Sequence, residues 1–189
     1  EFRRVLFRSK GEALDAAIHV FCEHGFAGTS ATMLTSAMKI GRQSLYDTFQ
    51  DKWQLYCAAL QRYAETETHA HIAALRSGPK AIDGIRKMMD RVVRNAHQPC
   101  LGVGSISEFG DKEEQVNAIR AASGKLLSAA LIDTIRTAQQ DGDLVADSEP
   151  RHMAAFLWAS ISALRLAARG GSGEAELRAL GQLAMRALT

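Results

Sequence analysis

The sequence is poor in proline and has no pattern of paired cysteines. It contains three prolines in 189 residues, and because proline interrupts helices, this scarcity favours long ones. The three cysteines, Cys22, Cys57 and Cys100, are widely spaced and form no CxxC motif. An odd, scattered set is typical of reduced thiols and argues against a disulfide scaffold, so we expect a cytoplasmic protein.

Long apolar runs and a strong net charge are also missing. No run approaches the ~18 apolar residues that a membrane span requires, so we expect no membrane partner. The formal net charge of +2 does not by itself indicate nucleic-acid binding. Apolar residues make up 47% of the chain and charged residues 23%, which is typical of a globular protein.

Catalytic and metal-binding motifs are not found either. The sequence has no HExxH, no phosphate-binding glycine loop, and no Ser/His/Asp set that it can bring together. His69 and His71 are two residues apart, so a helix directs them to different sides. We interpret Glu65 and Glu67 as members of solvated helix faces. The sequence therefore predicts no catalytic residue, no metal, no cofactor and no enzyme activity.

The first nine residues, EFRRVLFRS, do not fit the pattern that follows them. The segment VLFRS is what a common sequencing adapter gives when it is translated. We interpret residues 1–9 as a non-native artefact or scar and leave them out of the functional argument.

Beyond residue 9, apolar residues recur at intervals of three and four, which is the helical period. This spacing predicts helices over 10–24, 31–38, 42–48, 53–77, 80–97, 103–110, 112–140, 149–169 and 174–188. No segment alternates with a period of two for long enough to form a strand. The expected fold is all-α with about nine helices, three of them short and at the front.

The break between the second and third helices, Lys39-Ile40-Gly41, gives the front of the chain the outline of a helix-turn-helix. The second helix of such a pair enters the major groove of DNA. Here its first turn would carry Arg42, Gln43 and Ser44, and arginine and glutamine match the edges of guanine and adenine. Taken alone, a short helix with a polar first turn is usually a solvated connector.

The polar residues around this turn suit contacts with phosphates, which fix the register of a protein on DNA. Thr29 and Ser30 precede the second helix, where N–H groups and the helix dipole favour an anion. The predicted DNA-binding residues are Thr29, Ser30, Lys39, Arg42, Gln43, Ser44, Tyr46, Thr48 and Lys52.

Residues 25–56 resemble the DNA-binding domain of TetR-family transcriptional repressors. The shared residues are Gly25-Phe26, Thr29-Ser30, Leu45-Tyr46, Phe49, Lys52 and Leu55. The resemblance implies a helix-turn-helix domain over 10–56 and a helical ligand-binding and dimerisation domain over 57–189. It also implies a homodimer on a near-palindromic double-stranded operator, which a small-molecule inducer of unknown identity releases by moving the long fourth helix.

Two features depart from the family pattern. The turn Lys39-Ile40-Gly41 stands where the family usually has Gly, a small residue and Ser, so the third helix lacks a serine cap. Residues 10–60 contain four basic and five acidic residues. DNA affinity must therefore come from placed contacts and from dimerisation rather than from a basic surface.

The last two helices are the candidates for pairing two subunits. Residues 153–168 are apolar around nearly the whole helix, which is more than one buried face requires. The alternative is that this helix is central to the core of a monomer. The predicted dimer interface consists of Phe156, Ala159, Ile161, Leu164, Leu177, Leu180 and Leu183.

A ligand pocket is harder to place from the sequence. The candidates are apolar or adaptable side chains, each of which is also explained as plain core: Met88, Met89, Val92, Cys100, Phe109 and Trp158.

The segment PCLGVGSISEFG (99–110) resembles the Gly-Cys-Leu segment of a TetR subgroup that includes regulators responding to electrophiles. Cys100 directly precedes an expected helix, a position that favours a thiolate. One alternative function is therefore a redox or electrophile sensor acting through Cys100, although inert packing also explains this cysteine. An alternative from another class is a helical ligand carrier or enzyme without DNA binding.

Overall fold

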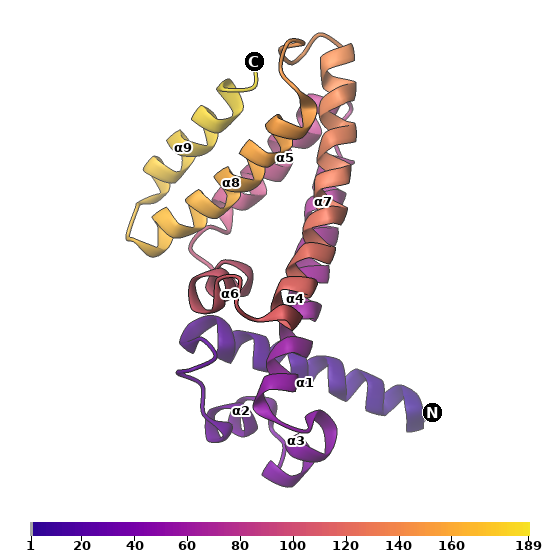
Figure 1. Cartoon of the computed structure of the whole chain (residues 1–189), viewed down its shortest axis with the longest axis vertical. Coiled ribbons are helices and arrows are strands. Elements are labelled where there is room, and N and C mark those ends of the chain that lie inside the picture. The colour runs from indigo at the N-terminus through magenta and orange to yellow at the C-terminus, as the bar shows by residue number, and fades with distance from the viewer. Residues whose placement is uncertain (1) are drawn as a thin grey trace. The chain divides into compact units, whose positions relative to one another are not determined.

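The computed structural model describes residues 2–189, with side chains from Lys10 onward. These residues form nine α-helices and no strand (Figure 1). The predicted all-α fold is confirmed. Glu1 and the side chains of 2–9, part of the stretch that we interpreted as an artefact, lie outside the described residues. The helices are α1 (Phe2–His24), α2 (Ala31–Met38), α3 (Arg42–Phe49), α4 (Lys52–Leu75), α5 (Ala81–Arg94), α6 (Leu101–Phe109), α7 (Glu114–Gln140), α8 (Pro150–Arg169) and α9 (Glu174–Arg186).

Several helix ends carry residues that suit a helix end. The Ser30 hydroxyl accepts a hydrogen bond from the Met33 N–H at 3.2 Å and caps α2. Pro150 begins α8, where a missing N–H costs no helical hydrogen bond. Gly25 follows α1 with φ of 69°, a left-handed conformation that glycine adopts freely.

The chain divides into two compact units. Unit 1 comprises the residues up to Glu65 and Pro99–Ala121, and unit 2 comprises Thr66–Gln98 and Ala122–Thr189. Helices α4 and α7 therefore contribute residues to both units. The sequence-based boundary lay between residues 56 and 57, whereas the compact units divide within α4 and include α6 in unit 1.

The core of unit 1 packs the short helices α2 and α3 against α1 and the start of α4. Leu34 of α2, Leu45 and Phe49 of α3, and Leu55 of α4 are buried in it. These residues recur at helical spacing, so each short helix turns one apolar face inward and leaves its polar residues outside.

An aromatic cluster explains why α6 belongs to unit 1. The ring of Phe109, in α6, lies 5.9, 5.5 and 5.4 Å from the rings of Phe26, Trp53 and Tyr56. The sequence separates Phe109 from these partners by more than fifty residues. Such packing between distant segments is not visible in a local helical pattern.

Unit 2 is built on α5, α8 and α9, which pack against one another. A Cβ atom on Gly84 would lie 1.9 Å from the Leu75 carbonyl oxygen, so α5 approaches the end of α4 as closely as only glycine permits. None of the helices in the described residues is long and apolar enough to cross a membrane. The large buried side chains of this core include Ile85, Met88, Met89, Val92, Leu131, Leu157 and Leu177.

Candidate nucleic-acid interface

The first turn of α3 presents its polar side chains together. Arg42, Gln43 and Ser44 are all exposed, whereas Leu45 and Phe49 are buried at 1% and 6% exposure. The apolar pair fixes the helix from inside, and the polar triplet remains free to meet another molecule. This is the arrangement that a recognition helix requires.

Two contacts within α3 hold these polar side chains in the unbound protein. The Gln43 amide donates to the Asp47 carboxylate at 2.8 Å, and the Arg42 guanidinium lies 5.8 Å from the centre of the Tyr46 ring. Gln43 would therefore have to leave Asp47 to bond a base. Thr48, another predicted DNA-binding residue, is exposed on the same helix.

The turn before α3 contains a left-handed residue that is not glycine. Lys39 caps α2 with φ of 54° and ψ of 40°, a conformation that costs a non-glycine residue roughly 1 kcal/mol. Gly41 begins α3 without a side-chain cap. Lys39 is exposed and points its charge away from the core of unit 1.

Thr29 and Lys52, two of the predicted phosphate contacts, instead hold the loop between α1 and α2. Thr29 is 3% exposed, and its hydroxyl donates to the Gly25 carbonyl oxygen at 2.5 Å. The Lys52 ammonium donates to the carbonyl oxygens of Phe26 and Thr29, each at 2.9 Å. Both side chains therefore stabilise the loop through bonds within the protein. Ser30, in contrast, is exposed at the start of α2.

Glu108, near the end of α6, holds the same loop from its other side. Its carboxylate accepts hydrogen bonds from the backbone N–H groups of Phe26 at 2.8 Å and Ala27 at 2.7 Å. Sequence analysis did not find this residue, because its partners are backbone groups about eighty residues away. The loop that leads into α2 is therefore fixed by Lys52 on its carbonyl oxygens and by Glu108 on its N–H groups.

The residues predicted for a dimer interface fall into two groups. Phe156, Leu180 and Leu183 are exposed by 43%, 38% and 52%, as an interface requires. Leu164 and Leu177 are buried at 2% and 1%, because they lie on the faces of α8 and α9 that pack within unit 2.

Other residues of α8 complete the exposed apolar face. Ala159 is exposed, and Ile161 is half-buried against the core of unit 2. Trp158 and Leu166 are exposed by 42% and 51%. Trp158 was predicted to line a pocket, and its side chain is exposed on α8.

The six predicted pocket residues do not form one cavity. Met88, Met89 and Val92 are buried in the core of unit 2. Cys100 and Phe109 belong to unit 1, where Phe109 is part of the aromatic cluster. An apolar residue on a helix fills a core as readily as it lines a pocket, so the helical pattern alone does not separate the two roles.

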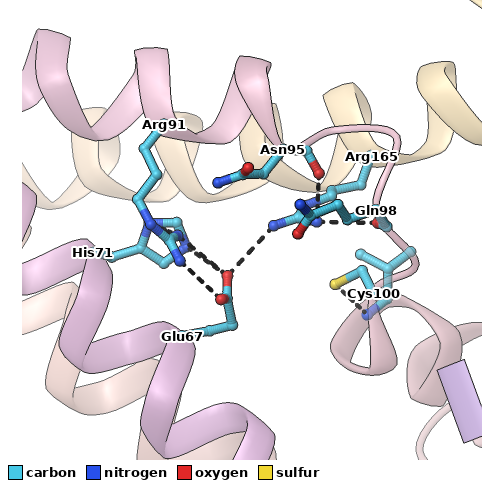
Figure 2. A network of polar contacts seen from close by, with 8 residues as sticks. Glu67, His71, Arg91, Asn95, Gln98, Cys100 and Arg165 are labelled. Atoms are coloured by element: carbon cyan, nitrogen blue, oxygen red, sulfur yellow. Dashed lines mark hydrogen bonds and ion pairs between the residues drawn. The ribbon is translucent and has the colours of Figure 1, made fainter. Parts of the chain in front are cut away.

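Unit 2 contains a buried charged network that the sequence did not predict (Figure 2). Glu67 accepts hydrogen bonds from Arg91 at 2.8 Å and from Arg165 at 3.4 Å. His71 and Arg165 are both 6% exposed. We interpreted Glu67 as part of a solvated helix face, but it is half-buried, because α4, α5 and α8 bring Glu67, Arg91 and Arg165 together.

Burial and neighbouring charges set the ionisation of this network. Burial, followed by the charge of Arg91, lowers the pKa of His71 to about 4. Burial by itself raises the pKa of Glu67, but the hydrogen bond and charge of Arg91 outweigh it and leave that pKa below its ordinary value. At neutral pH, Glu67 is thus charged and His71 is not.

Arg165 also joins α8 to the end of α5. One of its terminal nitrogens donates to the carbonyl oxygens of Asn95 and Gln98, at 3.0 and 3.2 Å, where the negative end of a helix dipole favours a cation. Its Nε is buried without a hydrogen-bond partner among the described residues.

Cys100 occupies the cap position of α6. Its sulfur accepts a hydrogen bond from the Val103 N–H at 3.5 Å, and the residue is half-buried. Cys57 is buried, and burial raises the pKa of its thiol to about 11. No group of three or more histidine, cysteine, aspartate or glutamate side chains in the described part of the chain could hold a metal ion.

Comparisons with known proteins agree with this geometry. The family model "Bacterial regulatory proteins, tetR family" matches residues 13–59. The model "Tetracyclin repressor-like, C-terminal domain" matches residues 80–182, which is more than half of the chain.

Two sequence relatives are transcriptional regulators. The uncharacterized HTH-type transcriptional regulator YezE of Bacillus subtilis (strain 168) is 29% identical over 136 residues, covering 69% of this chain and 70% of its own. The HTH-type transcriptional repressor ComR of Escherichia coli (strain K12) is 23% identical over 184 residues, covering 92% and 86%.

Two solved structures have the same fold. The TetR family transcriptional regulator CifR, a cysteine mutant complexed with 26-base-pair double-strand operator DNA, is 27% identical and superposes with a TM-score of 0.79 over 93% of this chain and 94% of its own. The reduced form of NemR of E. coli, at 19% identity, superposes with a TM-score of 0.85 over 96% and 97%, and this likeness concerns the fold alone. The matched families and relatives are regulators rather than enzymes. The chain belongs to the TetR family and is a DNA-binding transcriptional regulator.

Proposed function

We propose that the protein is a dimeric repressor that reads a near-palindromic operator through α3 and leaves it when a small-molecule effector binds. The first turn of α3 carries this proposal, because Arg42, Gln43 and Ser44 are exposed together on a helix fixed from behind. The operator complex of CifR supports it. In a dimer, the two α3 helices would enter major grooves about 34–36 Å apart.

The experiment for DNA reading is replacement of Arg42 by alanine. If Arg42 bonds a guanine bidentately, the variant should lose about 1–3 kcal/mol of operator affinity and its preference at one base pair. Fluorescence anisotropy with the DNA upstream of the protein's own gene, and with single-base variants of it, would measure both losses. Arg76→Ala, which removes an exposed arginine of unit 2, is the control. Unchanged base preference in Arg42→Ala would remove the assigned role.

The exposed apolar face of α8 and α9 supports pairing of two copies. The exposed large apolar side chains are Phe156 and Leu166 of α8 and Leu180 and Leu183 of α9, and Trp158 is exposed on another side of α8. Apolar side chains of this size rarely gather on the surface of a protein that acts as a monomer. A second copy would bury the face against itself and bring two recognition helices to one operator.

The effector is assigned to unit 2 by the family resemblance. Met88, Met89 and Val92 are fully buried, so an interior ligand would bind a conformation in which this core opens. Release from DNA requires the effector to bind that conformation more tightly than the operator-bound one. Displacement of α4, which carries Lys52 at one end and Glu67 nearer the other, would link the two states.

A second candidate is a regulator that responds to electrophiles through Cys100. The observation in its favour is the hydrogen bond from the Val103 N–H to the Cys100 sulfur at the start of α6, the helix that also carries Glu108. Conjugate addition to N-ethylmaleimide would form a bond between this sulfur and a ring carbon, and the thiol proton would end on the neighbouring carbon.

The test compares operator binding before and after treatment with N-ethylmaleimide. If Cys100 is the sensor, the treated native protein should lose most of its affinity and Cys100→Ser should keep it. Cys22→Ser, which changes another half-buried cysteine, should behave like the native protein. Equal losses in the native protein and in Cys100→Ser would end the sensor hypothesis.

A further inference from the structure

A groove of about 460 Å³ lies in unit 2 between α5 and α9. Its size falls in the range of roughly 300–1,000 Å³ that is usual for small-molecule sites. Neither the exposed turn of α3 nor the apolar face of α8 and α9 shares its lining residues. The operator and dimer proposals therefore leave this groove without a role.

The wall formed by α5 is a single stripe along the helix. Arg86, Met89, Asp90 and Val93 line the groove, and their spacing of three, four and seven places them on one face. Met89 is buried and Val93 half-buried, while Arg86 and Asp90 are exposed. This wall has an apolar base and a charged edge.

The wall formed by α9 repeats the same spacing. Arg178, Gly181, Gln182 and Met185 line the groove from this side. A Cβ atom on Gly181 would lie 2.7 Å from the Val93 Cγ2 atom, so the two helices meet at the bottom of the groove. Leu180 and Leu183 lie at other positions around α9, and the groove is therefore separate from the apolar face.

The charged edge of the groove is mainly positive. Arg86, Arg178 and Arg186 line it together with one carboxylate side chain, that of Asp90. Arg178 is paired with Glu174 of its own helix at 3.1 Å, and both side chains are exposed, so this pair is weak. No ion pair involves Arg186 within the described part of the chain. Arg86 is likewise paired with Asp83 of its own helix at 3.2 Å, so Arg178 and Arg186 are the groups left to meet an anion.

We propose that this groove binds an amphiphilic monocarboxylate with an unbranched acyl tail. The tail lies on the apolar base made by the half-buried Val93 and Met185, with the buried Met89 directly beneath it, and the carboxylate meets the guanidinium groups of Arg178 and Arg186. A guanidinium matches a carboxylate in shape and charge, and methionine adapts to flexible chains. This site does not depend on the proposed operator or on an effector inside unit 2.

The test uses decanoate as the probe and the methionine methyl groups as reporters. Two of the six methionines of the chain, Met89 and Met185, line the groove. With ¹³C-methyl methionine, decanoate should shift these two signals in a saturable way and leave Met153 in place. Binding should strengthen about two- to fourfold for each methylene added between hexanoate and decanoate, because each adds buried apolar surface.

Two further arms separate the tail from the head group. Decanol, which has the tail without the charge, and acetate, which has the charge without the tail, should each bind at least tenfold more weakly than decanoate. If decanol binds as tightly as decanoate, or if decanoate shifts Met153 rather than Met89 and Met185, the proposal is overturned.

Matched arginine variants locate the head group. The double variant Arg178→Gln/Arg186→Gln should bind decanoate about three- to tenfold more weakly, as expected for exposed charge-assisted hydrogen bonds. Arg136→Gln is the control, because Arg136 is 59% exposed and paired within its own helix, much as Arg178 is at 58%. Equal affinities in the two variants would overturn the assignment, and circular dichroism would verify that both are folded.

Discussion

In unit 2 the carboxylate of Glu67 joins two guanidinium groups in the interior, whereas in unit 1 the carboxylate of Glu108 joins two backbone N–H groups at the surface. The partner Arg165 is 5% exposed in its side chain. Phe26 and Ala27, which Glu108 binds, belong to a half-exposed loop. The shortest bond is 2.8 Å long at Glu67 and 2.7 Å long at Glu108, yet the surroundings of the two carboxylates differ.

The two carboxylates therefore contribute differently to the stability of the protein. A buried charge that loses its partner keeps the cost of its desolvation, so the network around Glu67 governs stability. At the surface, water replaces a lost partner, so Glu108 contributes little free energy. Glu108 instead fixes the position of the loop that leads directly into α2.

Removal of Glu67 should therefore have the largest effect on stability. Glu67→Ala leaves Arg91 and Arg165 with an unmatched positive charge, and we expect a loss of about 3 kcal/mol in the free energy of unfolding. Urea denaturation followed by circular dichroism would measure it. Glu65→Ala is the control, since Glu65 is exposed in the same helix and bonds only Gln61 among the described contacts. If both variants lose the same amount, the network does not stabilise the fold.

Acid should weaken the interior network before it affects the surface. The pKa of His71 is lowered to about 4 from 6.5, so the unfolded chain binds a proton in this window and the folded chain does not. Stability from His71 is therefore complete above pH 6.5 and falls by about 1.4 kcal/mol for each pH unit down to about pH 4. The lowered pKa of Glu67 adds a further loss as the pH falls below about 4.5.

Thermal melts between pH 7 and pH 4.5 would test this dependence. The other five histidines are exposed, so the slope should belong mainly to His71. His71→Gln should flatten the pH dependence, and His69→Gln, which changes an exposed histidine two residues earlier in α4, should leave it as it is. If the melting temperature of His71→Gln depends on pH as strongly as that of the native protein, another group causes the acid sensitivity.

The two regions also differ in how far the sequence predicts them. The recognition turn was predicted because its pattern is local: Leu45 and Phe49 share one face, and Arg42 to Ser44 occupy the next. The network of unit 2 was not predicted, because Glu67, Arg91 and Arg165 look like ordinary surface charges until three helices bring them together. Helix boundaries and exposed turns follow from short-range spacing, whereas buried polar partners depend on tertiary packing.

Lys52 illustrates the same limit at a smaller scale. Its spacing from Phe49 and Leu55 fits the family pattern, and this led to its prediction as a phosphate contact. The structure places its ammonium on the carbonyl oxygens of Phe26 and Thr29. The sequence therefore singled out the position, but the tertiary contact determines which group the side chain holds.

The smallest effect on stability should come from Glu108. Glu108→Gln keeps the shape of the side chain and weakens its bonds to the Phe26 and Ala27 N–H groups, which should cost no more than about 1 kcal/mol of stability. Operator affinity should nevertheless fall severalfold, because the loop before α2 loses one of its two supports.

Glu113→Gln removes the same charge from an exposed position of unit 1, so it has the same general effect on attraction to phosphates. Anisotropy titrations at one fixed salt concentration would compare the two variants. Weaker operator binding in Glu108→Gln alone would assign the loss to the loop, and equal binding would mean that Glu108 has no part in positioning the recognition helix.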